Sequence, residues 1–489
     1  MTRWLCGTAV SFSMVLSACG GGGGSTPTPT PAPIASPAPT PTPAPVATCS
    51  LRARQDWAAA QLREFYLFPE TLPAVFDPSP FNSVEAYIDS LTATARAQGR
   101  DRFFTFLTSI AEENAFFNSG ASAGFGVRLS TDAAARRVFV VEAFEGAPAL
   151  AAGIDRGTEL VAIGTTANDL RTVDAIIAAE GPGGVTNALG PSTSGTTRVL
   201  RIADAAGTRT VTVTKTEFTI PPVSTRYGAQ IIDDGGKRVG YLNLRTFIST
   251  ADPALRNAFA SFRAQGITEV IVDFRYNGGG LVSIADLMGD LLGGNRSPSE
   301  VFSFTTFRDS KSQFNETRNF MPLAQSVSPT KIAFIGTRSS ASASELVINA
   351  FIPYLRANAA LVGTNTFGKP VGQIALDRPE CDDRLRVVAF KTENAARRGE
   401  YFNGLATEVE ASCQAPDDIT RQLGNPQEGS TRQALDFLAG RSCTRISGVA
   451  GQTARTSGVG DAARAVAARR EMLVPDQPTP AQREVPGLF

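Results

Sequence analysis

The 489-residue sequence contains no histidine. This absence excludes every catalytic scheme that needs an imidazole: Ser-His-Asp triads, Cys-His pairs and histidine-ligated zinc. Acid–base chemistry near neutral pH must therefore use a carboxylate, a lysine of lowered pKa, a tyrosine or a cysteine.

The chain also has no net charge, because its 46 Lys and Arg residues equal its 46 Asp and Glu residues. Such a balance gives no electrostatic reason to expect a nucleic-acid partner. After the N-terminus, the sequence lacks the run of ~20 apolar residues that a transmembrane helix needs. The length exceeds that of a single hydrophobic core, so two or three domains are expected.

The N-terminus has the features of an export signal. Arg3 precedes an apolar run from Trp4 to Leu16 that is too short to span a bilayer. The string Leu16-Ser17-Ala18-Cys19 resembles a bacterial lipobox. It predicts a lipoprotein signal peptide over residues 1–18 and lipidation of Cys19; an ordinary secretory signal cleaved nearby is the alternative.

Residues 20–48 contain no charge and are rich in Gly, Pro, Thr and Ala. Such a segment buries no core and favours extended polyproline II, which at ~3.1 Å per residue reaches on the order of 80 Å. We interpret it as a tether between a lipid anchor and a folded region. Because Gly20 rather than Asp follows the lipidated cysteine, we expect the outer membrane, with the protein facing the periplasm.

Cysteine is scarce, and four cysteines lie beyond the signal and lipid sites: Cys49, Cys381, Cys413 and Cys443. An exported compartment favours disulfides, and four cysteines allow three pairings. We expect Cys381–Cys413, which would enclose a local segment, and Cys49–Cys443, which would join the two ends of the folded region. The alternative is free buried thiols. No CxxC pair indicates a metal or redox site.

Hydrophobic periodicity divides the folded region into parts, which together predict a multidomain α+β protein. Residues 49–118 have helical spacing, with a third amphipathic stretch at 101–117. Residues 119–218 alternate as strands do, and residues 219–445 read as an α/β domain. Residues 446–489 are expected to be a disordered tail, with a helix at 461–472 as its one candidate element.

The β region begins with the letters GFGV, and residues 146–164 place a short Ala-rich helix between turn glycines. Two further runs, 198–202 and 208–213, read as a hairpin. This order resembles a PDZ domain, in which a Gly-rich loop donates N–H groups to a peptide that adds as a strand. The resemblance implies a peptide-binding loop formed by Gly124, Phe125, Gly126 and Val127. A β domain with no peptide site is the alternative.

From residue 238 onward, strands and helices alternate, which is typical of a layered α/β domain. The expected strands are 239–244, 268–274 and 331–335, and the expected helices are 253–264, 281–292 and 341–355.

Three motifs in this domain suggest chemistry. DFRYNGGG, residues 273–280, ends a buried strand with glycines that let backbone N–H groups approach a substrate. RSSASASE, residues 338–345, exposes serines where a helix begins, and the N-terminus of that helix favours a developing oxyanion. TFGKPVGQ, residues 366–373, surrounds a lysine with apolar neighbours that would lower its pKa and release the amine as a base.

In this order, the three motifs resemble those of the C-terminal processing (tail-specific) peptidases. The resemblance covers about residues 50–440 and implies a crotonase-like catalytic domain with a Ser-Lys dyad and no metal or organic cofactor. It implies Ser342 as nucleophile, Lys369 as general base and Gln373 as the residue that orients it. The implied oxyanion donors are the N–H groups of Ala343 and Gly279. The implied substrates are flexible protein C-termini; an adaptor or an oligomer is left open.

The sequence departs from the family pattern at three points. Gly278 stands where the family has Pro, and Ser339 stands where Gly often precedes the serine motif. The interval between serine and lysine is also about two residues longer than usual, which leaves Ser344 as an alternative nucleophile.

Three competing functions remain. Ser328-Pro329-Thr330-Lys331 has the S-x-x-K spacing of penicillin-binding proteins, but Pro329 opposes a catalytic helix there. The second is a lipoprotein that keeps the peptidase fold and binds peptides or envelope partners without cleaving them. The third is acyl-group chemistry on a non-peptide substrate.

Overall fold

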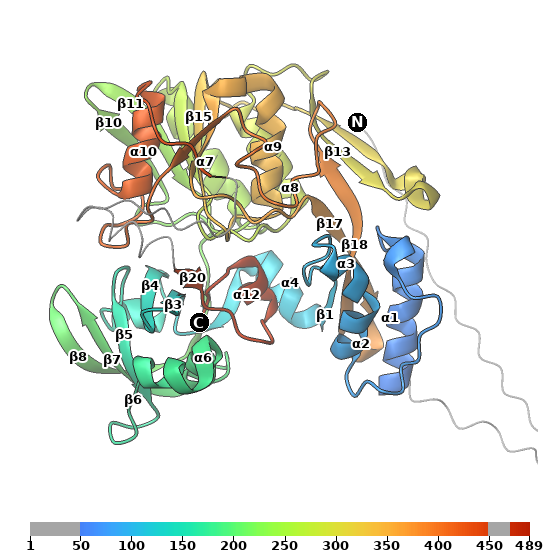
Figure 1. Ribbon diagram of the computed structural model, residues 1–489. Coiled ribbons are helices and arrows are strands. Elements are labelled where there is room, and N and C mark those ends of the chain that lie inside the picture. Colours follow the sequence, from blue (N-terminus) through green and yellow to red (C-terminus); the bar gives the residue numbers. More distant parts are fainter. Residues whose placement is uncertain (1–48, 448–469) are drawn as a thin grey trace, which may run out of the picture. The chain divides into compact units, whose positions relative to one another are not determined.

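Five parallel strands form the centre of the α/β domain in the computed structural model (Figure 1). The sheet order is β10-β11-β12-β15-β16-β19, and only β10 is antiparallel to its neighbour. The strands are β10 (Ala229–Asp234), β11 (Lys237–Asn243), β12 (Glu269–Asp273), β15 (Lys331–Gly336), β16 (Ala359–Gly363) and β19 (Ala411–Gln414). The three strands expected from the sequence are confirmed, each within two residues.

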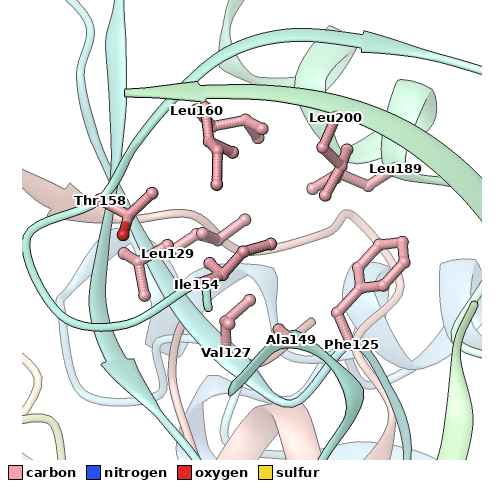
Figure 2. Close-up of a pocket in the computed structure, with 11 residues that line it drawn as sticks. Phe125, Val127, Leu129, Ala149, Ile154, Thr158, Leu160, Leu189 and Leu200 are labelled. Atoms are coloured by element: carbon pink, nitrogen blue, oxygen red, sulfur yellow. The ribbon is translucent and has the colours of Figure 1, made fainter. Parts of the chain in front are cut away.

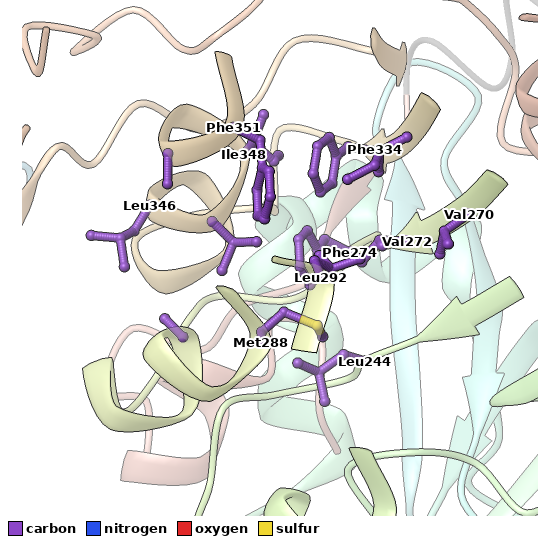
Figure 3. Packing of buried hydrophobic residues seen from close by; sticks show 14 of the residues in the cluster. Leu244, Val270, Val272, Phe274, Met288, Leu292, Phe334, Leu346, Ile348 and Phe351 are labelled. Carbon is purple, nitrogen blue, oxygen red and sulfur yellow. The ribbon is translucent and has the colours of Figure 1, made fainter. Parts of the chain in front are cut away.

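Helices cover both faces of this sheet. One face packs against α7 (Ala251–Ala264), α8 (Val282–Leu292) and α9 (Ala343–Leu355), and the other against α10 (Gly429–Leu438). Figure 3 shows the first of these interfaces, where Phe274 and Phe334 of the sheet side meet Phe351 of α9. The strands have apolar residues on both faces because both faces are buried. The layered α/β architecture expected from the alternation is therefore present.

A second sheet, of order β1-β18-β13-β14 with β17 paired to β18, joins the N-terminal region to the α/β domain. Its strands are β1 (Phe106–Ser109), β13 (Val301–Phe307), β14 (Glu316–Asn319), β17 (Val371–Arg378) and β18 (Asp383–Glu393). The expected helical stretch at 101–117 is only partly correct, because residues 106–109 form an edge strand on β18.

The N-terminal helices pack on this second sheet rather than forming a core of their own. They are α1 (Leu51–Phe65), α2 (Val84–Leu91), α3 (Ala93–Ala97) and α4 (Ile110–Ser119), and short 3-10 turns occur at Pro69–Thr71, Asp309–Phe314, Arg356–Asn358 and Pro379–Cys381. Leu62 of α1 and Tyr87 of α2 share one apolar cluster with Leu385 and Val387 of β18. Residues 49–118 thus belong to the same folded unit as β17 and β18.

The disulfides differ from the expected pairing. Cys49 is bonded to Cys381 and Cys413 to Cys443, with Cα–Cα distances of 5.5 and 5.4 Å. Cys49 precedes α1, which packs on β18, and Cys381 lies in the turn between β17 and β18. The packing of α1 on this sheet therefore brings together two cysteines that are 332 positions apart in sequence.

The small β domain, residues 119–218, forms a sheet of order β3-β4-β5-β7-β8, with β6 paired to β5, and β20 (Glu471–Met472) from the end of the chain adds to β3. Its elements are β2 (Ala121–Gly124), β3 (Val127–Asp132), β4 (Arg137–Ala143), α5 (Pro148–Ala151), β5 (Glu159–Gly164), β6 (Arg171–Thr172), α6 (Val173–Leu189), β7 (Thr197–Asp204), β8 (Gly207–Thr214) and β9 (Thr216–Thr219). The hairpin expected from residues 198–202 and 208–213 is confirmed as β7–β8. Strands β2 and β9 pair at the two ends of the domain.

Buried ion pairs fix the small β domain to the α/β domain. Glu142 of β4 forms ion pairs with Arg128 and Arg245, with an N–O distance of 2.7 Å in each. Burial would raise the pKa of Glu142, but the two guanidinium groups lower it to about 2. Arg128 also donates to the backbone oxygen of Tyr276, in the turn that follows β12. Removing one partner of such a buried network would leave an uncompensated charge, so the two domains are held in register.

The structure describes residues 49–447 and 470–489. The predicted signal peptide, the lipidation site Cys19, the tether and most of the candidate helix at 461–472 lie outside these residues. Residues 470–489 correct the expectation of a disordered tail, since they contain β20 (Glu471–Met472) and α12 (Pro480–Glu484). Within the described residues no helix is long and apolar enough to cross a membrane.

Candidate active site

The turn after β12 is attached by backbone and side-chain bonds to the start of α9. Asn277 accepts at its backbone oxygen from Ala341 N–H at 3.0 Å, and Asn277 Nδ2 donates to Leu244 O at 2.7 Å. Ser340 Oγ donates to Phe274 O at 2.7 Å.

Three residues of the turn have positive φ: Tyr276, Gly279 and Gly280. A side chain at Gly279 would place its Cβ 2.8 Å from Ser342 Cβ. Glycine is therefore required for the turn to lie against the serine motif.

Ser342 lies between β15 and α9 as the N-cap residue of the helix. Its φ of 55° and ψ of −115° are outside the regions that L-residues normally occupy. Such backbone strain costs on the order of 1–3 kcal/mol and clusters at functional sites. The side chain keeps partial exposure, whereas its neighbours Ala341 and Ala343 are buried. A strained, accessible serine at a helix N-terminus has the geometry expected of a nucleophile.

Ser344 has a different environment. It is fully buried, and its hydroxyl donates to Asn277 O at 3.2 Å. A hydroxyl that is both covered and hydrogen-bonded to the backbone is a packing element. These contacts favour Ser342 over Ser344 as the reactive serine.

A buried carboxylate joins the serine segment to the lysine segment. Glu345, in the first turn of α9, is 0% exposed. It accepts from the N–H groups of Ser342 at 3.1 Å, Gly368 at 2.7 Å and Lys369 at 2.7 Å. Burial raises the pKa of Glu345, and these hydrogen bonds oppose the increase. Glu345 therefore sets the distance between two loops that are separated by more than twenty residues in sequence.

We expect Glu345→Ala to destabilise the fold and to reduce activity. A buried N–H that loses its acceptor costs about 1–3 kcal/mol, and this applies in full to Gly368; the part-buried N–H groups of Ser342 and Lys369 add smaller costs, so we expect a loss of unfolding free energy on the order of 2–3 kcal/mol. Urea unfolding checks the loss, with Glu112→Ala on exposed α4 as the matched control. Equal unfolding midpoints for the two variants would contradict the bridging role.

Lys369 lies between β16 and β17, is half-buried, and contacts Phe104 of the N-terminal region. Its ammonium donates to Gln373 Oε1 at 2.9 Å and lies 4.9 Å from the ring centroid of Phe104. Gln373 Nε2 in turn donates to Phe104 O, which fixes the amide. Burial lowers the pKa of Lys369, an effect that Glu484 opposes and Arg386 adds to. The lowered pKa makes the free amine more accessible near neutral pH, as a general base requires.

Within the described residues, Ser342 Oγ and Lys369 Nζ are not hydrogen-bonded to each other. Their loops are nevertheless joined twice, through Glu345 and through the bond from Phe367 N–H to Ser340 O at 3.0 Å. Catalytic hydrogen bonds are often long in unliganded sites and shorten when substrate binds. These connections hold the serine segment and the lysine segment side by side.

The candidate oxyanion donors have different hydrogen-bond partners. Gly279 N–H donates to Asn277 Oδ1 at 2.9 Å and is therefore already engaged. Gly278 N–H instead donates to the carbonyl oxygen of Glu484 at 3.1 Å. Ala343 N–H, at the start of α9, has no hydrogen-bond partner among the described residues. Because the partner of Gly278 N–H is itself a backbone carbonyl oxygen, Gly278 is the glycine of this turn whose N–H already contacts a carbonyl.

The expected peptide-binding loop lies at the edge of the small β domain. The N–H groups of Gly126 and Val127 donate to Phe489 O at 2.8 and 3.2 Å, and Gly124 packs on the same residue. Phe125 is buried and lines an apolar cavity of about 20 Å³ inside the domain (Figure 2). The cavity has no residue of the serine or lysine segments in its lining. It is therefore a packing void and not part of the reactive site.

Sequence reasoning missed Glu345, Gly278 and the segment around Glu484. The signal for Glu345 was present, because it is three residues after Ser342, where a capping-box carboxylate is expected. Among the described residues no cluster of three His, Cys, Asp or Glu side chains could hold a metal ion.

A layered α/β domain with a partly exposed serine at a helix start, and a lysine on a loop joined to that start, has an arrangement that serine hydrolases use. Comparison with known proteins narrows this class. Residues 238–405 match the model of peptidase family S41. A carboxyl-terminal-processing protease of Picosynechococcus sp. is 26% identical over 65% of this chain and 71% of its own length. Carboxyl-terminal-processing peptidase 3, chloroplastic, of Arabidopsis thaliana is 26% identical over 80% of this chain and 70% of its own.

The fold agrees with this match. A Bacteroides fragilis protein described as an S41 protease superposes with a TM-score of 0.60 at 23% identity, over 78% of this chain and 97% of that one. The chain is therefore a serine-type peptidase, and its residues 238–405 match peptidase family S41.

Proposed function

We propose that the protein is an endopeptidase that cuts flexible proteins near their C-termini, with Ser342 as nucleophile and Lys369 as general base. The main support is the buried Glu345 carboxylate, which binds the N–H groups of both residues. The names of the carboxyl-terminal-processing relatives are the support for the substrate class.

In the proposed reaction, neutral Lys369 accepts the proton of Ser342 Oγ while that oxygen attacks the peptide carbonyl carbon. The carbonyl oxygen becomes an oxyanion that Ala343 N–H and Gly278 N–H stabilise; one such donor contributes roughly 2.7–4 kcal/mol. The lysine then gives the proton to the departing amine, and an acyl-enzyme remains. Water hydrolyses this ester with the lysine again as base. Gln373 keeps the amine in position throughout.

The small β domain is proposed to select the substrate. The loop Gly124–Val127 and the edge of β3 would bind the end of a protein chain as an added strand. We further propose that the protein resides in the bacterial cell envelope, held by a lipid on Cys19, so that its substrates are exported proteins.

The test is to incubate residues 49–489 with an unfolded protein and with the same protein in its folded form. We expect cleavage of the unfolded form alone, with products shortened from the C-terminus when measured by mass spectrometry. Binding of the unfolded protein without any cleavage would instead support the non-cleaving lipoprotein.

A further inference from the structure

Residues 470–489 fill the free edge of β3. Strand β20 pairs antiparallel with Ser130 and Thr131, and Leu473 N–H donates to Leu129 O at 3.0 Å. Residues 487–489 then continue the same ladder: Leu129 N–H donates to Gly487 O at 2.7 Å, and Phe489 N–H to Val127 O at 2.9 Å. A strand added at this edge is how a peptide would bind, so the segment occupies the position proposed for substrate.

The last residue of the ladder sits in the peptide-binding loop. Phe489 O accepts from two successive N–H groups, those of Gly126 and Val127. A side chain at Gly124 would place its Cβ 2.7 Å from the carbonyl carbon of Phe489. The Phe489 side chain is 2% exposed, in the same apolar cluster as Phe125 and Leu189. The loop therefore binds this residue by backbone and side chain together.

Between the two paired stretches, the segment contacts the turn that follows β12 and contains Gly278. Figure 1 shows α12 between the small β domain and the helices of the N-terminal region. Glu484 O accepts from Gly278 N–H, the proposed oxyanion donor. A Cβ at Gly278 would lie 2.9 Å from the carbonyl oxygens of both Arg483 and Glu484. Glycine in place of proline at this position thus supplies the N–H and the space that the segment needs.

The charges on the segment also affect the proposed base. Glu484 is close enough to Lys369 to raise its pKa, which favours the charged ammonium. Arg483 places its guanidinium 3.8 Å from the ring of Phe106. Gln482 Nε2 donates to Leu488 O at 2.9 Å, which holds the crossing and the ladder together.

We propose that residues 470–489 are an internal ligand of the peptidase, which occupies the β3 edge and the Gly278 turn until a substrate displaces it. This proposal rests on the proposed function, which makes the β3 edge and the Gly278 turn the places where a substrate binds. It also defines the competing substrates: chain ends that place an aromatic or large apolar side chain where Phe489 lies.

The test compares residues 49–489 with Phe489→Asp and with Phe314→Asp, whose phenylalanine is 51% exposed and packs on Phe307 of β13. The probe is a fluorescent peptide of sequence PAQREVPGLF with a free carboxylate, and its binding is measured by anisotropy. Burying a carboxylate in the apolar cluster is unfavourable, so the internal ligand should dissociate. We expect Phe489→Asp to bind the probe at least tenfold more tightly than the parent and Phe314→Asp.

A second variant keeps the test decisive if Phe489→Asp misfolds. Gly487 has φ +83°, and a Cβ there would lie 2.8 Å from Leu129 O, so Gly487→Val should release the segment without placing a charge in the core. Equal probe affinity in the parent and in Gly487→Val overturns the proposal.

Cleavage of an unfolded protein separates this proposal from the proposed function. If the variants bind the probe more tightly but none of them cleaves, the internal-ligand proposal is supported and the proposed endopeptidase function is contradicted. If all variants cleave and bind the probe with equal affinity, the proposed function is supported and the internal-ligand proposal is contradicted.

Discussion

Replacing Ser342 with alanine should abolish peptide cleavage. Without the hydroxyl no acyl-enzyme forms, and loss of a serine nucleophile in comparable enzymes lowers kcat by up to about a million-fold. We expect a loss of at least about a thousandfold in kcat/KM on an unfolded protein, with little change in stability. The φ of 55° at position 342 is as unfavourable for alanine as it is for serine, so the substitution should leave the backbone strain unchanged.

Ser344→Ala is the matched control, because it removes the same atoms two residues away. It breaks one buried hydrogen bond, to Asn277 O, at a cost of about 1 kcal/mol of unfolding free energy. Activity should stay within a few-fold of the parent. An inactive Ser344→Ala beside an active Ser342→Ala would exchange the two assignments.

The α/β domain was predictable because its strands are buried on both faces and its helices are amphipathic. Strand β12, at Glu269–Asp273, is entirely buried and reads as an apolar run. The motif positions were equally visible, since each follows a strand of this sheet. Apolar periodicity indicates which residues face a core, so it predicts these strands and helices from local sequence alone.

The disulfides and the second sheet were not predictable in the same way. The pairing of Cys49 with Cys381 depends on α1 packing against β18 across 332 positions. Strand β1 is only four residues long and lies inside a helical pattern. Neither feature has a local signal, because the partner that creates each one is far away in the chain.

The conformation of residues 470–489 is fixed mainly by contacts with the rest of the protein. Its sequence has four prolines in twenty residues and no sustained apolar periodicity, which is typical of a disordered tail. The backbone groups of β3 and the N–H of Gly278 provide the hydrogen bonds that the segment cannot make by itself. The substitution at Gly278, which the motif comparison showed only as a departure, is the one sequence signal connected with it.

Lys369→Met should lower kcat/KM by at least about a thousandfold, because the serine then has no base. In the parent, the amine must be neutral to accept a proton, so kcat/KM should rise with pH. Since burial lowers the pKa of Lys369, this increase should level off below the ordinary lysine value of 10.5. With no histidine in the chain, an imidazole cannot cause this limb of the profile.

Stability separates lost chemistry from lost folding. A lysine whose pKa is lower in the folded state binds fewer protons there than in the unfolded state between the two pKa values. Its ammonium therefore opposes folding at neutral pH, and the free energy of unfolding rises as pH increases toward 10.5. Lys369→Met removes that penalty, so it should unfold at the same or higher urea concentration than the parent while being inactive. Lys237→Met, on an exposed lysine of β11, should retain activity and the same pH profile. A Lys369→Met enzyme that cleaves with the parent's pH profile would exclude Lys369 as the base.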